Sequence, residues 1–328
     1  MKIPIRIEKG DNSVDLHISW SLHNTCNYRC SYCPSYNQDA SQKWLTQGHI
    51  VKFIDAVHDY YVTRMGFHKI QVSFTGGEPT LWKGFKDACR YIADKGMTLG
   101  VTSNCSMTAD YWDEFACLFD WICLSYHPAY VNDQNFYDVV RIMHDRPDTA
   151  VPALRFMMLP ENKYWDQCVA FADRIKSTMD NWAVEFVKIQ NDFGIDIVPV
   201  KYTREQTEFM RERGYEEHHG RPGLVRPTPY TWDLRVVYNT GEKEKLMTND
   251  LVNRDLASFV NWRCNIGLEL LCVDYYGSVT RSGCQQGGEI GRLNLTDALV
   301  FPSEPVICRK QRCNCGTEIM VSKSRDGG

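Results

Sequence analysis

Three cysteines near the N-terminus have the spacing of a metal-binding loop. Cys26, Cys30 and Cys33 lie in the run Cys-Asn-Tyr-Arg-Cys-Ser-Tyr-Cys, which is a C-x3-C-x2-C pattern. Thiolates on one short loop can bind three irons of a 4Fe–4S cube and leave the fourth iron open to a ligand that is not protein. The spacing therefore predicts a cluster that carries out catalytic chemistry.

A second motif follows an alternating apolar stretch, Ile70 to Phe74. This motif is Gly76-Gly77-Glu78-Pro79. Glycines allow a backbone to approach a ligand without a Cβ in the way, and a carboxylate beside them can pair with an ammonium group. Gly-Gly-Glu-Pro alone is also typical of an ordinary turn.

Together the two motifs resemble the signature of the radical S-adenosylmethionine (radical SAM) family, in which the amino and carboxylate groups of SAM chelate the open iron. The resemblance implies that the reduced cluster cleaves SAM to methionine and a 5′-deoxyadenosyl radical, which abstracts a substrate hydrogen. It also implies that Glu78 pairs with the methionine ammonium. The SAM-binding residues expected in the two motifs are Tyr32, Gly76, Gly77, Glu78 and Pro79.

A structural zinc site is the alternative interpretation of the cysteine run. Zinc takes tetrahedral thiolates, and its structural sites close with a fourth Cys or His at short range, for which His23 is available. The Gly-Gly-Glu-Pro motif at the expected distance favours the iron–sulfur cluster. A non-enzymatic zinc-binding protein stays open as an alternative.

The composition is that of a globular enzyme. The 328 residues are 43% hydrophobic and 24% charged, and the net charge of −4 does not indicate a polyanionic partner. No apolar run approaches the ~20 residues of a membrane span, and no secretory signal is evident. We therefore expect a cytoplasmic protein without a membrane partner. Its 14 cysteines then favour metal binding over disulfides.

Short apolar strands alternate with amphipathic helices from residue 15 to about 190, which predicts an α/β fold with a parallel sheet. The strands are expected near 15–21, 69–75, 97–103, 120–126, 150–158 and 183–190, and the helices near 46–65, 84–95, 109–118, 133–146 and 163–178. The radical SAM resemblance implies a partial (β/α)6 parallel barrel with a small C-terminal cysteine-rich α+β extension.

The expected domains are a radical SAM partial barrel at 1–195, a connecting segment or lid at 196–260 and an auxiliary cluster domain at 261–328. Within the middle segment, the sequence predicts a charged helix from Thr203 to Glu217, a linker or loop from His218 to Pro229, and a hairpin turn at 236–242.

Polar residues at strand ends are further candidates, because ligands of parallel α/β folds bind at the carboxyl ends of the strands. Ser103 and Asn104 resemble the family's ribose-contacting segment, and a turn or helix cap is the equal alternative. Arg155 lies in an apolar strand and needs an anionic partner, for which the resemblance suggests the SAM carboxylate. The other candidates for SAM or substrate contacts are Ser125, Tyr126, His127, Glu185, Lys188 and Gln190.

A second set of cysteines crowds the last quarter of the chain: Cys264, Cys284, Cys308, Cys313 and Cys315. Residues 271–280 between the first two are predicted to form a strand, a turn and a strand. The arrangement resembles the SPASM/twitch extension of radical SAM enzymes, which ligates one auxiliary 4Fe–4S cluster. Five cysteines exceed the four positions of a cube, and Cys308 is the least expected ligand. Cys272 is left out, because related proteins usually have an aliphatic residue at its strand position. A zinc ribbon is the alternative.

Five other cysteines are expected in the core: Cys89, Cys105, Cys117, Cys123 and Cys168.

The sequence does not identify the substrate. Because the first barrel strand is expected near residue 15, no room is evident for an N-terminal peptide-recognition domain. This favours oxidation or rearrangement of a small-molecule or nucleotide-type substrate. The expected electron donor is a flavodoxin or ferredoxin. A ribosomal-peptide maturase that forms crosslinks or epimerises residues, and uses a separate recognition protein, is the alternative.

Overall fold

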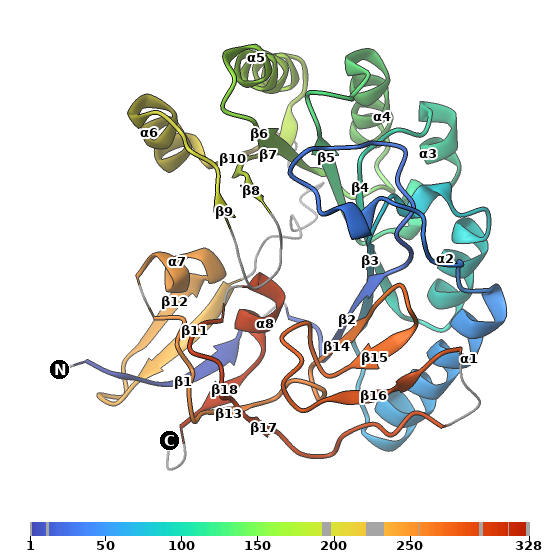
Figure 1. Cartoon of the computed structure of the whole chain (residues 1–328), viewed down its shortest axis with the longest axis vertical. Coiled ribbons are helices and arrows are strands. Elements are labelled where there is room, and N and C mark those ends of the chain that lie inside the picture. The colour runs from blue at the N-terminus through green and yellow to red at the C-terminus, as the bar shows by residue number, and fades with distance from the viewer. Residues whose placement is uncertain are drawn as a thin grey trace.

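The computed structural model describes residues 2–10, 13–191, 198–220, 233–254, 256–294, 298–313 and 315–325. One sheet has ten strands in the order β10-β7-β6-β5-β4-β3-β2-β14-β15-β16, and a second sheet has six in the order β12-β11-β1-β18-β13-β17. The protein thus has a mixed α/β fold (Figure 1).

Six consecutive parallel strands form the centre of the larger sheet and confirm the six strands predicted from the sequence. They are β2 (Leu16–Ser21), β3 (Ile70–Thr75), β4 (Thr98–Ser103), β5 (Trp121–Tyr126), β6 (Ala153–Met158) and β7 (Asn181–Lys188). Apolar residues recur at every second position of these strands because the helices cover one face of the sheet. On that face, residues such as Ile18, Val72 and Leu99 are fully buried. The curvature of a partial barrel stays a prediction.

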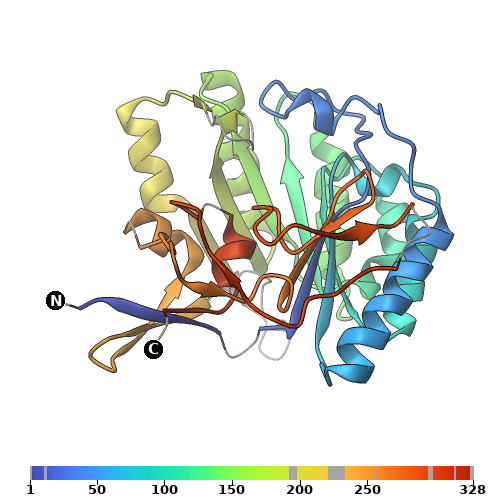
Figure 2. The same ribbon diagram turned by 60° about the horizontal axis from the view of Figure 1, so that its bottom comes forward.

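The helices between these strands lie along the outer side of the sheet (Figures 1 and 2). They are α1 (Gln47–Val57), α2 (Phe85–Asp94), α3 (Ala109–Phe115), α4 (Asp133–Asp145) and α5 (Asn162–Thr178), with short 3-10 turns at Ser35–Asn37, Pro79–Leu81 and Ala116–Leu118. The first predicted helix consists of two parts, since α1 continues as a π-helix, η2 (His58–Arg64). In η2, the Tyr61 hydroxyl donates to the carbonyl oxygen of Gly267 at 2.5 Å, which ties this helix to the C-terminal region.

The second sheet combines strands from both ends of the chain. β1 (Pro4–Lys9) pairs with β11 (Asp233–Tyr238) and β18 (Lys323–Ser324). The predicted hairpin is confirmed as β11 and β12 (Lys243–Met247), and the sheet is completed by β13 (Arg263–Cys264) and β17 (Val306–Ile307). β14 (Leu270–Val273), β15 (Ser278–Thr280) and β16 (Glu289–Arg292) instead extend the large sheet, because β14 pairs in parallel with β2. Strand pairing therefore crosses both predicted domain boundaries.

The predicted charged helix is too long. The helix α6 covers Arg204–Arg213, and the residues that follow form β10 (Tyr215–His219), antiparallel to β7. The open edge of β7 favours a strand there, and Glu216 forms ion pairs with Lys176 and Arg213. The predicted loop extends beyond the described residues from position 221 onward. The remaining elements are β8 (Gln190–Asn191), β9 (Val198–Pro199), α7 (Thr248–Asn253) and α8 (Gly316–Met320).

Four of the cysteines expected in the core are buried, namely Cys89, Cys105, Cys123 and Cys168. The prediction is wrong for Cys117, which is exposed. It lies in the 3-10 turn that follows α3, where the helical periodicity used for the prediction has ended.

Candidate functional site

The first cysteine run forms a loop directly after β2, at the carboxyl end of the parallel strands. The amide of Cys33 donates to the carbonyl oxygen of Cys30 at 3.1 Å. The side-chain amide of Gln38 donates to the carbonyl oxygens of both cysteines, at 3.3 Å for Cys30 and 3.0 Å for Cys33. The side-chain amide of the buried Asn24 donates to Asp39 at 2.8 Å. The returning chain thus fixes the loop, and no pattern in the sequence pointed to Gln38 or Asn24.

The glycine motif lies against the backbone of this cysteine loop. The amide of Gly77 donates to the carbonyl oxygen of His23, and that of Glu78 donates to the carbonyl oxygen of Thr25, both at 2.7 Å. A Cβ on Gly76 would lie 2.7 Å from the His23 carbonyl oxygen, and one on Gly77 would lie 2.0 Å from the Thr25 carbonyl oxygen. The glycines are therefore required by contact between two loops, and their predicted close approach to a ligand stays a prediction.

Glu78 is 1% exposed and connects the ends of β3 and β4. Its carboxylate accepts hydrogen bonds from the Ser103 hydroxyl at 2.8 Å, the Asn104 backbone amide at 2.6 Å and the Thr80 hydroxyl at 2.7 Å. Burial raises the pKa of Glu78, and these donors oppose the rise. The carboxylate thus has protein donors on both oxygens, and its predicted pairing with the SAM ammonium stays a prediction.

Two N–H groups are directed at the sulfur of Cys26. The Asn104 side-chain amide lies 3.7 Å and the Tyr28 backbone amide 3.4 Å from this sulfur. Asn104 also donates to the side-chain oxygen of Asn27 at 2.9 Å. N–H donors stabilise a thiolate and tune a cluster bound to it. The structure therefore places Asn104 beside Cys26, a predicted cluster ligand, and Ser103 beside Glu78.

His127 contacts the cysteine loop. The sequence suggested that His127 faces the substrate and predicted no contact between it and the loop. Its Nδ1 is 2.6 Å from the Tyr32 hydroxyl oxygen and 3.5 Å from the Cys30 sulfur. Burial lowers the pKa of His127 to about 4, so the ring is neutral at pH 7. Burial also raises the pKa values of Cys30 and Cys33 to about 11, so metal binding must displace their protons.

Apolar residues from the ends of β6 and β7 surround this part of the loop. Leu159 and Ile189 are buried against Cys30 and Tyr32. Such a lining excludes water from a cluster and lowers the local dielectric constant. The cysteine loop therefore has a rigid polar side, formed with the glycine motif, and an apolar side.

Arg155 has a protein partner. Its Nε donates to the Glu185 carboxylate at 2.7 Å, and the two side chains are 30% and 23% exposed. Ser125, Arg155 and Glu185 are direct neighbours across β5, β6 and β7. The anion that the sequence argument required is thus Glu185, and a contact of Arg155 or Ser125 with SAM stays a prediction. Lys188 lies at the end of β7 and Gln190 in β8.

Four of the five C-terminal cysteines surround one small cavity. It is lined by Cys264, Cys284, Cys308 and Cys313, and also by Ile266, Gln286, Lys310, Glu318 and Lys323. Cys315 is exposed and does not line this cavity, whereas Cys308, the least expected of the five, does. No pattern in the sequence pointed to Glu318, and the only signal for Lys323 was its position next to an apolar segment.

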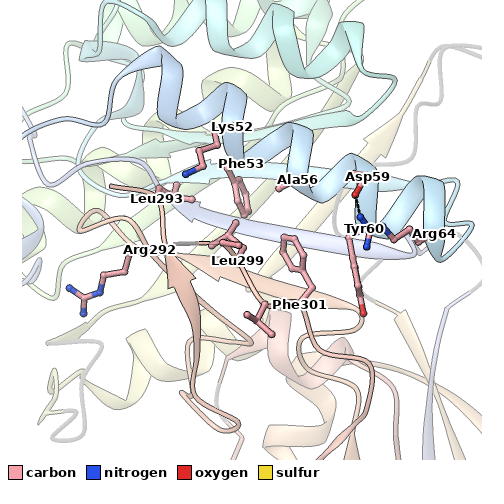
Figure 3. A pocket seen from close by; sticks show the side chains of 12 residues that line it. Lys52, Phe53, Ala56, Asp59, Tyr60, Arg64, Arg292, Leu293, Leu299 and Phe301 are labelled. Atoms are coloured by element: carbon pink, nitrogen blue, oxygen red, sulfur yellow. Dashed lines mark hydrogen bonds and ion pairs between the residues drawn. The ribbon is translucent and has the colours of Figure 1, made fainter. Parts of the chain in front are cut away.

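The described residues contain no group of three or more His, Cys, Asp or Glu arranged around a single metal ion. A cubane cluster does not need such a point, because each cysteine binds a different iron. A larger cavity of about 440 Å³ lies elsewhere, between α1, η2, residues 292–293 and residues 298–301. Figure 3 shows Phe53, Tyr60, Leu299 and Phe301 in its wall. None of the predicted site residues lines it.

Comparison with known proteins identifies the N-terminal part of the chain. Residues 20–150 match the family model of the Radical SAM superfamily. An S-adenosylmethionine-dependent nucleotide dehydratase of Flammeovirga pacifica is 30% identical over 121 residues, which are 37% of this chain and 41% of that protein. A GTP 3′,8-cyclase of Actinobacillus succinogenes is 35% identical over 95 residues, 25% of either protein. The chain spans less than half of the length of these curated relatives.

A solved structure of histidine-tagged anSMEcpe with bound AdoMet has a TM-score of 0.51 and 11% identity, and the similarity covers 86% of this chain and 78% of that chain. At this identity the similarity concerns the fold alone. The matched residues 20–150 include the cysteine loop, the glycine motif and Asn104, and end before Arg155. The match of residues 20–150 to the Radical SAM superfamily, together with the enzyme names of the relatives, supports an enzyme. No helix in the described ranges is long and apolar enough to cross a membrane.

Proposed function

From the radical SAM domain at residues 20–150, we propose that this protein is a radical SAM enzyme that reductively cleaves SAM and abstracts a hydrogen from a small-molecule or nucleotide-type substrate. The observation that carries the proposal is the contact between the two motifs, in which the backbone hydrogen bonds of Gly77 and Glu78 fix the loop that bears Cys26, Cys30 and Cys33. The names of the two curated relatives support a nucleotide as the substrate.

The cysteine loop suits a 4Fe–4S cluster with an open iron. Its three thiols lie on one loop, two N–H donors face the Cys26 sulfur, and apolar residues enclose Cys30. When bound, the cluster supplies the electron that cleaves SAM, for which a flavodoxin or ferredoxin is the proposed donor. The chain itself holds the loop in place and limits the access of water.

The proposed SAM site lies at the carboxyl ends of β2 to β6, in a partial (β/α)6 barrel. Gly76, Gly77 and Pro79 bring the end of β3 to the cysteine loop, and Tyr32 lies within that loop. Glu78 acts as the brace between β3 and β4, because its oxygens accept from Thr80, Ser103 and Asn104. Ser125 and Arg155 extend the proposed site along β5 and β6.

We assign an auxiliary 4Fe–4S cluster to the C-terminal cavity in a SPASM/twitch-like domain at 261–328, joined by the segment 196–260 to the barrel at 1–195. Four thiols around one cavity match the four positions of a cube, so the proposed ligands are Cys264, Cys284, Cys308 and Cys313. The space between them is about 20 Å³, so the cysteine side chains must rotate outward when the cluster is inserted.

Anaerobic iron and sulfide analysis of the wild type and of the triple variant Cys26→Ala, Cys30→Ala, Cys33→Ala tests both sites. We expect about eight irons in the wild type and about four in the variant, because each cube holds four. With SAM and dithionite, only the wild type should form 5′-deoxyadenosine. Zinc in place of iron, without SAM cleavage, would overturn the proposal in favour of a zinc-binding protein.

The substrate class is tested by adding nucleoside triphosphates one at a time to the reduced wild type with SAM. A nucleotide that is the substrate should increase 5′-deoxyadenosine formation and be converted to a product of altered mass. The triple variant serves as the control. If none of the nucleotides increases SAM cleavage, the nucleotide assignment is wrong, whereas the radical SAM assignment stands on the iron and SAM data.

A further inference from the structure

Lys323 is a buried lysine at the wall of the C-terminal cysteine cavity. Only 3% of its surface is exposed. In β18 it is paired directly with Cys264 of β13, and directly paired residues of neighbouring strands project from the same face of a sheet. Lys323 and Cys264 therefore lie side by side, and both line the cavity together with Cys284, Cys308 and Cys313.

The hydrogen bonds of Lys323 suit an ammonium group. Its Nζ donates to three backbone carbonyl oxygens, at 2.5 Å to Glu318, 3.2 Å to Ile319 and 2.6 Å to Val321. An ammonium group has three N–H bonds, whereas a neutral amine has two. The acceptors come from the last turn of α8 and from the residue that follows it, where the helix dipole also favours a cation.

The chemistry of the cavity gives this charge a consequence. A cube bound by four thiolates gains one negative charge when it is reduced, so a nearby fixed cation stabilises the reduced form more than the oxidised form. Lys310 lines the same cavity but is exposed, so water and salt screen its charge. Glu318 also lines it, and its carboxylate accepts a hydrogen bond from the Cys284 amide.

We propose that the buried ammonium group of Lys323 raises the reduction potential of the auxiliary cluster held by Cys264, Cys284, Cys308 and Cys313. A cluster with a raised potential accepts an electron more readily, which suits an acceptor of an electron from substrate. This inference rests on the auxiliary cluster of the proposed function. Lys323 is a tuning residue that acts through its charge and does not bind iron.

An EPR-monitored reductive titration measures this effect. It is made in the triple alanine variant of the first cysteine loop, so that only the auxiliary cluster contributes. Lys323→Met removes the charge at similar length, and Lys323→Gln removes it but keeps N–H donors for the carbonyls. We expect both changes to lower the midpoint potential at unchanged iron content. The matched control, Lys310→Met, should produce a clearly smaller shift because Lys310 is exposed.

The Lys323 proposal is overturned if either Lys323 variant keeps its four irons and titrates at the parent's potential, or if Lys310→Met shifts the potential as much. If Lys323→Met loses iron because the C-terminal end of α8 is no longer stabilised, the Lys323→Gln titration decides. A triple alanine parent without iron would instead overturn the auxiliary cluster, and with it that part of the proposed function.

Discussion

Gly77→Ala is the most direct test of the contact between the cysteine loop and the glycine motif. A Cβ at this position would lie 2.0 Å from the carbonyl oxygen, 2.5 Å from the carbonyl carbon and 2.8 Å from the nitrogen of Thr25. All three are backbone atoms, so no side-chain rotation can relieve the overlap. The two loops must separate, and the loop that carries Cys26 must move.

The expected loss of stability follows from these contacts. Separation breaks the 2.7 Å bonds from Gly77 to His23 and from Glu78 to Thr25, each worth about 1 kcal/mol. Overpacking of a close contact typically costs about 1–3 kcal/mol more. We therefore expect Gly77→Ala to lower the free energy of unfolding by about 3–5 kcal/mol.

Anaerobic urea unfolding and iron analysis of the variant measure both consequences. The first cluster should be lost while the auxiliary iron remains, because the overlap displaces the first cysteine loop, whereas Gly77 does not line the C-terminal cavity. Gly48→Ala is the matched control, since its Cβ would meet only the Thr46 hydroxyl at 3.7 Å. Within α1 this change should stabilise the protein by about 0.5–1 kcal/mol. A Gly77→Ala protein within about 1 kcal/mol of wild type and with full iron content would contradict this prediction.

Three further predictions concern other parts of the two sites. His23 is 2% exposed, and burial lowers its pKa to about 4. The unfolded state therefore takes up a proton near pH 6.5 that the folded state refuses until about pH 4, so stability should fall by about 3 kcal/mol across this range. Denaturation of His23→Gln at pH 7, 6 and 5 should show a weaker dependence, and an unchanged slope would contradict the assignment. A double-mutant cycle with Arg155→Gln and Glu185→Gln should give a coupling of about 1 kcal/mol for this partly exposed pair, while zero coupling would leave Arg155 available to SAM. Iron analysis should show a loss of about four irons in Cys308→Ser and none in Cys315→Ser; the reverse would place Cys315 on the cluster.

The parallel strands and their helices were predictable because their patterns are local. Each strand from β2 to β7 alternates between a face covered by helices and an inner face, and each helix repeats its apolar residues at helical spacing. The helix predicted for the residues that form β10 was wrong, because the cause of this strand is not local. The charged residues after Arg213 suit a helix, but the open edge of β7 makes them a strand, and no local pattern contains that edge.

The first cysteine loop was likewise predictable, since three thiols and a glycine motif with fixed spacing are properties of the sequence alone. The partners of those residues were not. Glu78 accepts hydrogen bonds from Ser103 at the end of β4 and from Asn104 directly after it. The sequence suggested SAM contacts for all three, with a turn or helix cap as the equal alternative for Ser103 and Asn104. Only strand order shows that β3 and β4 are neighbours.

The sequence alone predicted the ligand chemistry: three cysteines proposed for an iron–sulfur cluster, five more near the C-terminus, and an α/β alternation that positions the first set. The tertiary structure decided which of those groups meet. It placed Cys308 on the cavity wall and Cys315 outside it, and it paired Cys264 with Lys323 across two strands. Side-chain chemistry belongs to a single residue and is written in the sequence, whereas proximity between distant residues depends on strand pairing and packing of the whole chain.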